Sequence, residues 1–235
     1  MSQQLALNVR LRDASSLENF IPGRNRELVE SLRVALNALA RDGHSAQPVV
    51  YLWGESGSGR SHLLEGACRA VDESQRRAAY VPLDQGPPLS PALLEDRETA
   101  ALVCLDNLDA VAGGEDWERA LFALTERLRA AGGMLLVADS RPTRDLGLCL
   151  ADLASRLAWG PIYHVQALDD DGKLEALRVR AMRRGLTLPD EVARYILSRQ
   201  PRDVHSLFAL LERLDQSSLR EQRRLTIPFV RSLGI

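Results

Sequence analysis

The sequence predicts an α/β fold in which a parallel five-stranded sheet is flanked by helices and followed by a small all-helical lid. Short apolar runs rich in β-branched residues alternate with stretches of helical spacing, and this alternation is typical of parallel sheets. After Leu168 the strand signals stop and only amphipathic helical patterns follow. The five predicted strands cover residues 49–53, 79–83, 101–105, 134–138 and 162–165.

The predicted helices and the charge distribution support the same division of the chain. The predicted helices are 61–71 and 116–131 between strands, and 169–185, 189–199 and 202–217 after them. Residues 172–235 carry 13 basic and 7 acidic residues, whereas the rest of the chain carries 17 and 25. The change in charge coincides with the loss of strand signals. We therefore expect an extended peptide at 1–12, an α/β domain at 13–168 and a helical lid at 169–235.

The composition indicates an ordinary globular protein. With 235 residues, 45% of them hydrophobic, the chain can bury a substantial core. No apolar run approaches the roughly 20 residues of a membrane-spanning helix, and the first residues lack a signal-peptide pattern, so we expect a cytoplasmic protein without membrane contact. The widely spaced Cys68, Cys104 and Cys149 support neither a disulfide framework nor a zinc site, so buried free thiols are expected.

A glycine-rich segment joins the first predicted strand to the helix after it. Its spacing is G-x-x-x-x-G-[K/R]-S, in which backbone N–H groups and a helix start surround phosphate oxygens. Arg60 would neutralise the outer phosphates, and the Ser61 hydroxyl would ligate Mg²⁺. The alternative is a plain glycine-rich turn. The predicted phosphate-binding residues are Gly54, Ser56, Gly57, Ser58, Gly59, Arg60 and Ser61.

Arg60 stands where this pattern commonly has lysine. Arginine is planar and bulky, whereas lysine is a compact point charge, so hydrolysis would suffer more than binding. However, Lys173 is the one lysine among 30 basic residues. A general replacement of lysine by arginine therefore explains Arg60 as well.

The third predicted strand leads into an acid, Asp106. In P-loop enzymes an acid at such a strand end holds Mg²⁺ through an intervening water. Asn107 follows where many of these enzymes have a carboxylate that orients the attacking water, and an amide cannot accept a proton in the same way. Asp109 is the nearest substitute. Alternatively, Asp106 caps the helix that follows the strand.

Asp139 and Ser140 follow the fourth predicted strand, at the sheet edge where ligands bind in open α/β sheets. One interpretation is that they sense the bound nucleotide. The other is that the Asp-Ser pair forms a turn before Pro142.

Arg156 lies just before the last predicted strand, too far along the chain to belong to the phosphate loop. In ring-forming ATPases an arginine at this place reaches the nucleotide of the neighbouring chain, an effect worth about 10³ to 10⁵ in rate. Otherwise Arg156 is one of many surface arginines.

Together these patterns resemble an AAA+ ATPase core with its lid, and in particular the Hda family of DnaA-related regulatory inactivators of DnaA. The resemblance spans nearly the whole chain. It rests on Gly-Arg-Ser-His at 59–62, Tyr-Val-Pro-Leu-Asp at 80–84, Leu-Asp-Asn at 105–107, Asp-Leu-Ala-Ser-Arg at 152–156 and Leu-Thr-Ile-Pro-Phe-Val at 225–230.

The first residues resemble the peptide by which that family docks on the β sliding clamp. An extended peptide with alternating apolar anchors suits a groove. The alternative is a frayed terminus or an edge strand, and Asn8 stands where proline is common, which would weaken docking. The clamp-binding residues would be Gln4, Leu5, Leu7 and Val9.

The resemblance implies a regulator that acts on a partner. On clamp-loaded DNA, Arg156 would act as an arginine finger on ATP bound to DnaA, while this chain's own site holds ADP and Mg²⁺ and is at most a poor ATPase. His62 would join the nucleotide site. At the nucleotide-sensing position of the lid the chain has His205, with Arg202 three residues earlier on the same helix face, and either would contact phosphate.

Two other functions remain open at this stage. One is an autonomous AAA+ ATPase such as a DnaA-like initiator or helicase loader, although no room is expected after Ile235 for a helix-turn-helix domain. The other is an adaptor that joins clamp and DnaA without catalysis. The basic lid is compatible with a weak DNA contact or with a solvated face. The oligomeric state stays open, and a homo-oligomer is compatible with the sequence.

Overall fold

A parallel five-stranded sheet forms the centre of the larger part of the molecule. The computed structural model describes residues 15–85, 89–199 and 203–234. The strands lie in the order β2-β3-β4-β1-β5, and every neighbouring pair is parallel. Their bounds are β1 (Val49–Trp53), β2 (Ala78–Pro82), β3 (Leu102–Asp106), β4 (Met134–Asp139) and β5 (Ile162–His164). The predicted strands are thus all present, with ends that differ by a residue.

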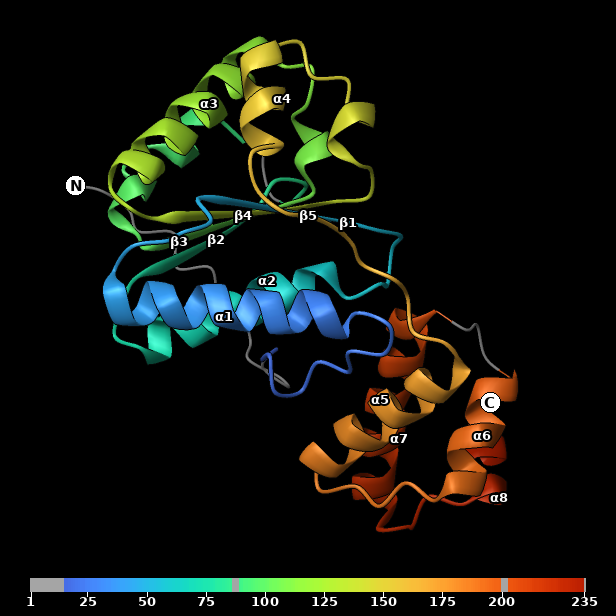
Figure 1. Cartoon of the computed structure of the whole chain (residues 1–235). Coiled ribbons are helices and arrows are strands. Elements are labelled where there is room, and N and C mark those ends of the chain that lie inside the picture. The colour runs from blue at the N-terminus through green and yellow to red at the C-terminus, as the bar shows by residue number, and fades with distance from the viewer. Residues whose placement is uncertain (1–14, 86–88, 200–202, 235) are drawn as a thin grey trace, which may run out of the picture.

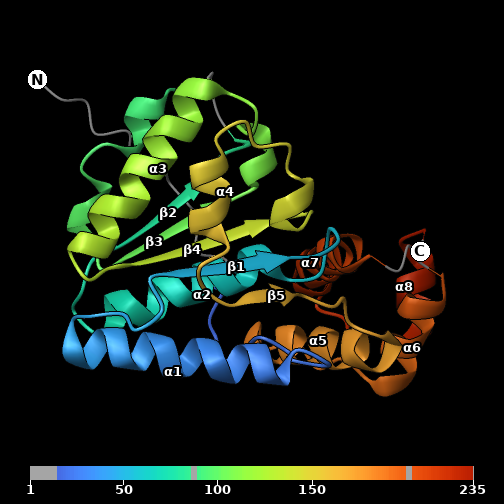
Figure 2. The same ribbon diagram turned by 45° about the horizontal axis from the view of Figure 1, so that its top comes forward.

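Helices cover both faces of the sheet (Figures 1 and 2). Helices α1 (Arg26–Asp42) and α2 (Arg60–Glu73) pack on one face over a core that includes Val50, Leu52 and Leu136. Helices α3 (Glu115–Ala130) and α4 (Ala151–Leu157) pack on the other, over Tyr51, Val103 and Val137 among others. Alternate strand residues therefore supply two separate cores, as the period of two in a strand requires. Short 3₁₀ helices lie in the connections: η1 (Pro91–Leu94), η2 (Arg97–Thr99), η3 (Leu108–Ala110) and η4 (Thr143–Asp145).

Helix α1 was not predicted, although its apolar residues follow helical spacing. Leu28, Leu32, Leu36 and Leu39 are all buried on one side of it. It ends at Gly43, which has a φ of 71° and donates its N–H to the carbonyl of Leu39. A glycine in the left-handed region is a common helix terminator. The apolar spacing and the terminating glycine were therefore both present in the sequence.

The C-terminal helices α5 (Asp170–Arg183), α6 (Asp190–Arg199), α7 (Val204–Glu221) and α8 (Ile227–Ser232) form a bundle beside the sheet domain (Figure 1). They enclose a core of their own that includes Leu177, Leu211 and Phe229. Helices α5, α7 and α8 are each capped at the N-terminus by a side chain that accepts a backbone N–H of the first turn. The accepting side chains are those of Asp169, Asp203 and Thr226. Residues 170–232 thus bury an apolar core without using the sheet.

One prediction about the cysteines was wrong. Cys68 and Cys104 are buried free thiols, but Cys149 is exposed, because it lies in the loop before α4 rather than on a packed face. Within the described ranges, no helix is long and apolar enough to span a membrane.

Candidate functional site

The glycine-rich segment forms the loop between β1 and α2, and its glycines are required by close contacts. Gly59 has a φ of 99°, and a Cβ there would lie 2.7 Å from a ring carbon of Phe20. A Cβ on Gly54 would lie 2.3 Å from the carbonyl oxygen of Val165. Because side chains at these positions would collide with Phe20 and with the end of β5, the sequence folds into this loop only with glycine there.

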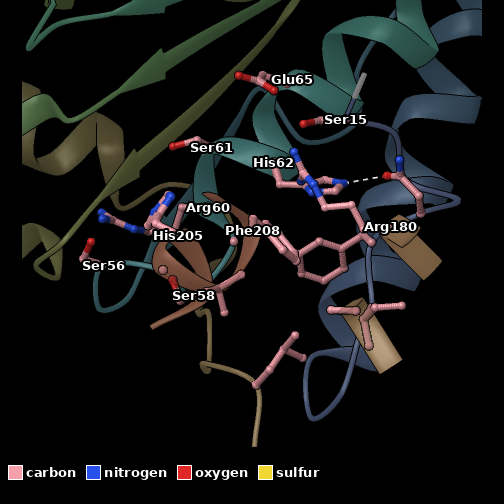
Figure 3. Close-up of a pocket in the computed structure, with 18 of the residues that line it drawn as sticks. Ser15, Ser56, Ser58, Arg60, Ser61, His62, Glu65, Arg180, His205 and Phe208 are labelled. Carbon is pink, nitrogen blue, oxygen red and sulfur yellow. Dashed lines mark hydrogen bonds between the residues drawn. The ribbon is translucent and has the colours of Figure 1, made fainter. Parts of the chain in front are cut away.

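A cavity of about 560 Å³ lies between this loop and the lid. Figure 3 shows side chains from both parts pointing into it. Loop residues Ser56, Gly57, Ser58, Gly59, Arg60, Ser61 and His62 line it, as predicted for a binding site, whereas Gly54 does not. The predicted loop residues therefore lie at one cavity, except Gly54, which packs against the backbone of Val165.

Two buried polar atoms of the loop fit an anion. The Ser58 hydroxyl and Nη1 of Arg60 have no hydrogen-bond partner among the residues that the structure describes. Buried polar groups normally have partners, so these atoms indicate a ligand with acceptor oxygens. The N-terminus of α2 begins at Arg60, and a helix start is favourable for phosphate. The cavity thus suits a nucleotide phosphate.

His62 fastens the segment before α1 to the loop. Its Nε2 lies 3.0 Å from the carbonyl oxygen of Ser16 and 2.7 Å from Oδ1 of Asn19. Since both partners are acceptors, Nε2 carries the proton and donates. The ring of Phe20 lies edge-on at 5.5 Å. Burial lowers the pKa of His62, which keeps the imidazole neutral.

The lid supplies cations and an aromatic ring that sequence reasoning did not single out. Arg180, Arg183 and Phe208 line the cavity beside His205. The guanidinium carbon of Arg180 lies 4.3 Å from the centre of the Phe208 ring. Arg180 and Arg183 stand three residues apart on α5, and that spacing was the available signal. Arg202, the alternative to His205, lies outside the described residues.

Ser61 and Asp106 lie on either side of Tyr80. Ser61 lines the cavity, whereas Asp106 is 1% exposed and lies behind it. The Tyr80 hydroxyl donates to Oδ2 of Asp106 at 2.8 Å, and the Asn107 N–H donates to Oδ1 at 3.1 Å. Burial raises the pKa of Tyr80, so the phenol remains a donor. Ser61 is therefore the residue that could reach a metal directly, and Asp106 could act only through a bridging water.

The carboxylates at the cavity differ from those the sequence suggested. Asn107 lines the cavity, but Asp109 points away and lies 3.7 Å from Nη2 of Arg141. Glu65 and Asp84 are the carboxylates that line it among the residues described. The described part of the chain contains no cluster of three or more His, Cys, Asp or Glu that could hold a metal ion.

Asp139 is not placed to sense a ligand, in contrast to one of its two predicted interpretations. It is fully buried and does not line the cavity. Its carboxylate accepts N–H groups from Asp109 at 2.6 Å and Arg141 at 2.9 Å, together with the Ser140 hydroxyl at 3.3 Å. Burial raises its pKa. Asp139 thus ties together the loops after β3 and β4, which is the turn-forming alternative.

Arg156 lies on α4 and is not among the residues that line the cavity. Its Nε lies 2.7 Å from Oε1 of Glu126, and its side chain is 26% exposed. The guanidinium carbon lies 3.8 Å from the centre of the Trp159 ring, which is itself 46% exposed. This arginine therefore faces a different region of the surface from the phosphate loop.

Comparison with known proteins identifies the lid and the fold. Residues 170–233 match the family model of the Hda lid domain. The chain superposes on domain III of the Thermotoga maritima replication initiation protein DnaA with a TM-score of 0.75 and 16% identity, covering 92% of this chain and 93% of that one. For replication initiator DnaA bound to AMPPCP and single-stranded DNA, the TM-score is 0.71 at 21% identity, with 89% and 68% covered.

A Thermotoga maritima RuvB Holliday junction branch migration motor is also similar, with a TM-score of 0.68, 18% identity, and 93% of this chain and 70% of that chain covered. At these identities the structural likeness establishes the fold. The match of the lid adds the family resemblance that the fold alone does not give. The chain therefore has the fold of DnaA domain III, and its residues 170–233 are similar to the lid domain of the Hda family.

Proposed function

We propose that this chain is a negative regulator of the initiation of DNA replication, which stimulates hydrolysis of ATP bound to DnaA while docked on the DNA-loaded β sliding clamp. The Hda-type lid and the DnaA-like fold support the choice of system. DnaA is proposed as the partner because its domain III shares this fold.

The observation that carries this proposal is the position of Arg156. It lies outside the cavity of its own chain and is partly exposed on α4. A guanidinium placed there can reach phosphate held by another chain but not phosphate held in its own loop. Arginine supplied in trans stabilises the charge on the transferred phosphoryl group and is worth about 10³ to 10⁵ in rate.

The chain's own site has a different task in this proposal: it binds ADP to hold the lid against the sheet domain. The cavity is lined from both parts, by Ser58, Arg60 and Ser61 of the loop and by Arg180 and His205 of the lid. Mg²⁺ at Ser61 would neutralise phosphate charge. An amide stands at Asn107 and Asp109 is turned toward Arg141, so neither of these two residues after β3 is placed to accept a proton from an attacking water.

Docking on the clamp is assigned to the first residues. Gln4, Leu5, Leu7 and Val9 lie outside the described residues, so this part rests on the sequence pattern. An extended peptide would place alternate side chains in the pockets of a groove. A weak contact between the basic lid and DNA would add to docking.

A reconstituted hydrolysis assay tests the proposal. DnaA loaded with labelled ATP is mixed with this chain, with and without clamp loaded on DNA. Faster hydrolysis is expected only when all components are present. Gln4→Ala should remove most of this effect, and in a separate pull-down it should be captured more weakly by clamp immobilised on beads. Rapid ATP turnover by the chain alone would instead identify an autonomous AAA+ ATPase.

A further inference from the structure

Helix α3 presents one stripe of side chains to α4 and to Arg156. Glu118, Phe122 and Glu126 are spaced by four residues and therefore share a face of the helix. Glu118 accepts the N–H groups of Cys149 at 3.0 Å and Leu150 at 2.6 Å, immediately before α4 begins. One end of α4 is thus fixed to α3 by a buried carboxylate.

The same stripe contacts the arginine at the other end of α4. The Phe122 ring centre lies 5.6 Å from the guanidinium carbon of Arg156, and Oε1 of Glu126 lies 2.7 Å from its Nε. Four of the five N–H donors of an arginine belong to its two Nη groups. Nε of Arg156 and Oε1 of Glu126 form an ion pair without the alignment of a hydrogen bond. Glu126 therefore attracts the Nε side of the guanidinium and leaves the donors of its two Nη groups for another partner.

Glu126 also pairs with a second arginine, and both arginines lie over the ring of Trp159. Its Oε2 lies 3.2 Å from Nη2 of Arg129. The guanidinium carbons of Arg156 and Arg129 lie 3.8 Å and 5.4 Å from the centre of the Trp159 ring. Two cations share one carboxylate, so the group keeps a net positive charge next to an exposed aromatic ring, which suits an anionic ligand.

We propose that Glu126 and Trp159 are positioning residues that hold the guanidinium of Arg156 in one orientation, for phosphate of a nucleoside triphosphate bound to a partner chain. Arg129 adds a second positive charge on the same surface. This inference rests on the proposed function of Arg156. A simple surface ion pair would contribute to stability alone, whereas a positioning residue controls the rate reached when the partner is saturated.

The first test separates these roles by titrating the chain against a fixed amount of DnaA-bound ATP in the presence of clamp on DNA. Glu126→Gln should lower the maximal stimulated rate about 10-fold, with the half-saturating amount of chain changed by less than about 2-fold, because the guanidinium is misplaced rather than lost. Trp159→Phe should retain more of the maximal rate than Trp159→Ala, because phenylalanine keeps a ring under the guanidinium.

A matched control is a carboxylate of η2 that pairs with the same helix α3. Glu98 is 27% exposed, against 29% for Glu126, and pairs at 3.1 Å with Arg127 of α3 instead of with Arg156. Glu98→Gln removes a similar ion pair and should leave the maximal rate unchanged. A maximal rate for Glu126→Gln within about 2-fold of the unmodified chain would overturn the inference.

A second measurement does not depend on hydrolysis. The chain has three tryptophans, so the indole N–H resonance of Trp159 can be assigned from its absence in Trp159→Phe. It should move in both Arg156→Ala and Glu126→Gln and stay in place in Glu98→Gln. An unmoved resonance in Glu126→Gln overturns the positioning role even if the proposed function holds. Full stimulation by Arg156→Ala overturns the proposed function, while this resonance still decides whether Glu126 orients Arg156.

Discussion

His62 Nε2 lies 2.7 Å from the side-chain oxygen of Asn19, which links the first turn of α2 to a segment 43 residues earlier in the chain. The same nitrogen lies 3.0 Å from the Ser16 carbonyl oxygen. The phosphate loop is thereby covered by the chain that precedes α1, and Phe20 of that segment lines the cavity beside it. The shape of the nucleotide site depends on this contact as well as on the loop.

The contact makes stability depend on pH. Burial lowers the pKa of His62 in the folded protein, while the unfolded chain has a pKa near 6.5. Below about pH 6.5 the unfolded state therefore binds more protons than the folded state, and stability falls as the pH drops. Well above that pH the imidazole of His62 is neutral in both states, so its protonation no longer lowers the stability. We expect a loss on the order of 1 kcal/mol in the free energy of unfolding between pH 7.5 and 5.5.

Urea titrations at the two pH values measure this change. His62→Gln removes the titrating group and should show a smaller loss between them. An equal loss in His62→Gln would assign the pH dependence to other groups.

Arg60 should determine the affinity for nucleotide. Its Nη1 is buried at the cavity without a partner in the part of the chain described, so Arg60→Ala removes a charge-assisted hydrogen bond to phosphate. A loss of about 10-fold or more in ADP affinity is expected by calorimetry, and Arg60→Lys should retain part of it. Arg69 also lies on α2 but pairs with Glu73 at 2.9 Å, so Arg69→Ala serves as the control. If Arg60→Ala bound ADP as tightly as the unmodified chain, the proposal that this loop binds the phosphate would be wrong.

Glu118 should contribute strongly to stability. It is fully buried and accepts three backbone N–H groups, from Gly113 at 2.8 Å, Cys149 at 3.0 Å and Leu150 at 2.6 Å. Glu118→Gln brings an amide NH₂ against one of these donors, which should cost about 1–3 kcal/mol in the free energy of unfolding. Glu73→Gln, which loses only an exposed ion pair, should cost less than about 1 kcal/mol. Equal losses would show that the buried carboxylate has no special role.

The parts of the fold that depend on local pattern were predictable. The five strands and the loop at Gly54–Ser61 follow from apolar runs, glycines and their spacing within a few residues. Helix α1 also follows a local apolar pattern, although it was not among the predicted helices. Cys149 shows the limit of a composition argument, because residue type alone does not say whether a loop position is covered.

The parts that depend on distant contacts were not predictable. Phe20 and Phe208 come to one cavity only when the lid folds over the loop, and nothing in their neighbourhood in the sequence indicates that. Asp139 follows a strand as ligand-binding acids do, yet its carboxylate is used by the loop around it. Glu126 and Arg156 are thirty positions apart, and only the packing of α3 against α4 brings them together.

The central claim is that Arg156 acts on nucleotide held by DnaA. The most direct measurement compares Arg156→Ala with the unmodified chain in hydrolysis of DnaA-bound ATP, with clamp loaded on DNA. Arg144→Ala is the control, because Arg144 is 84% exposed and lies in η4. We expect Arg156→Ala to bind ADP normally and to lose stimulation about 10³-fold, or to the assay background, while Arg144→Ala retains it. Full stimulation by Arg156→Ala would contradict the account and leave the chain as an adaptor between clamp and DnaA.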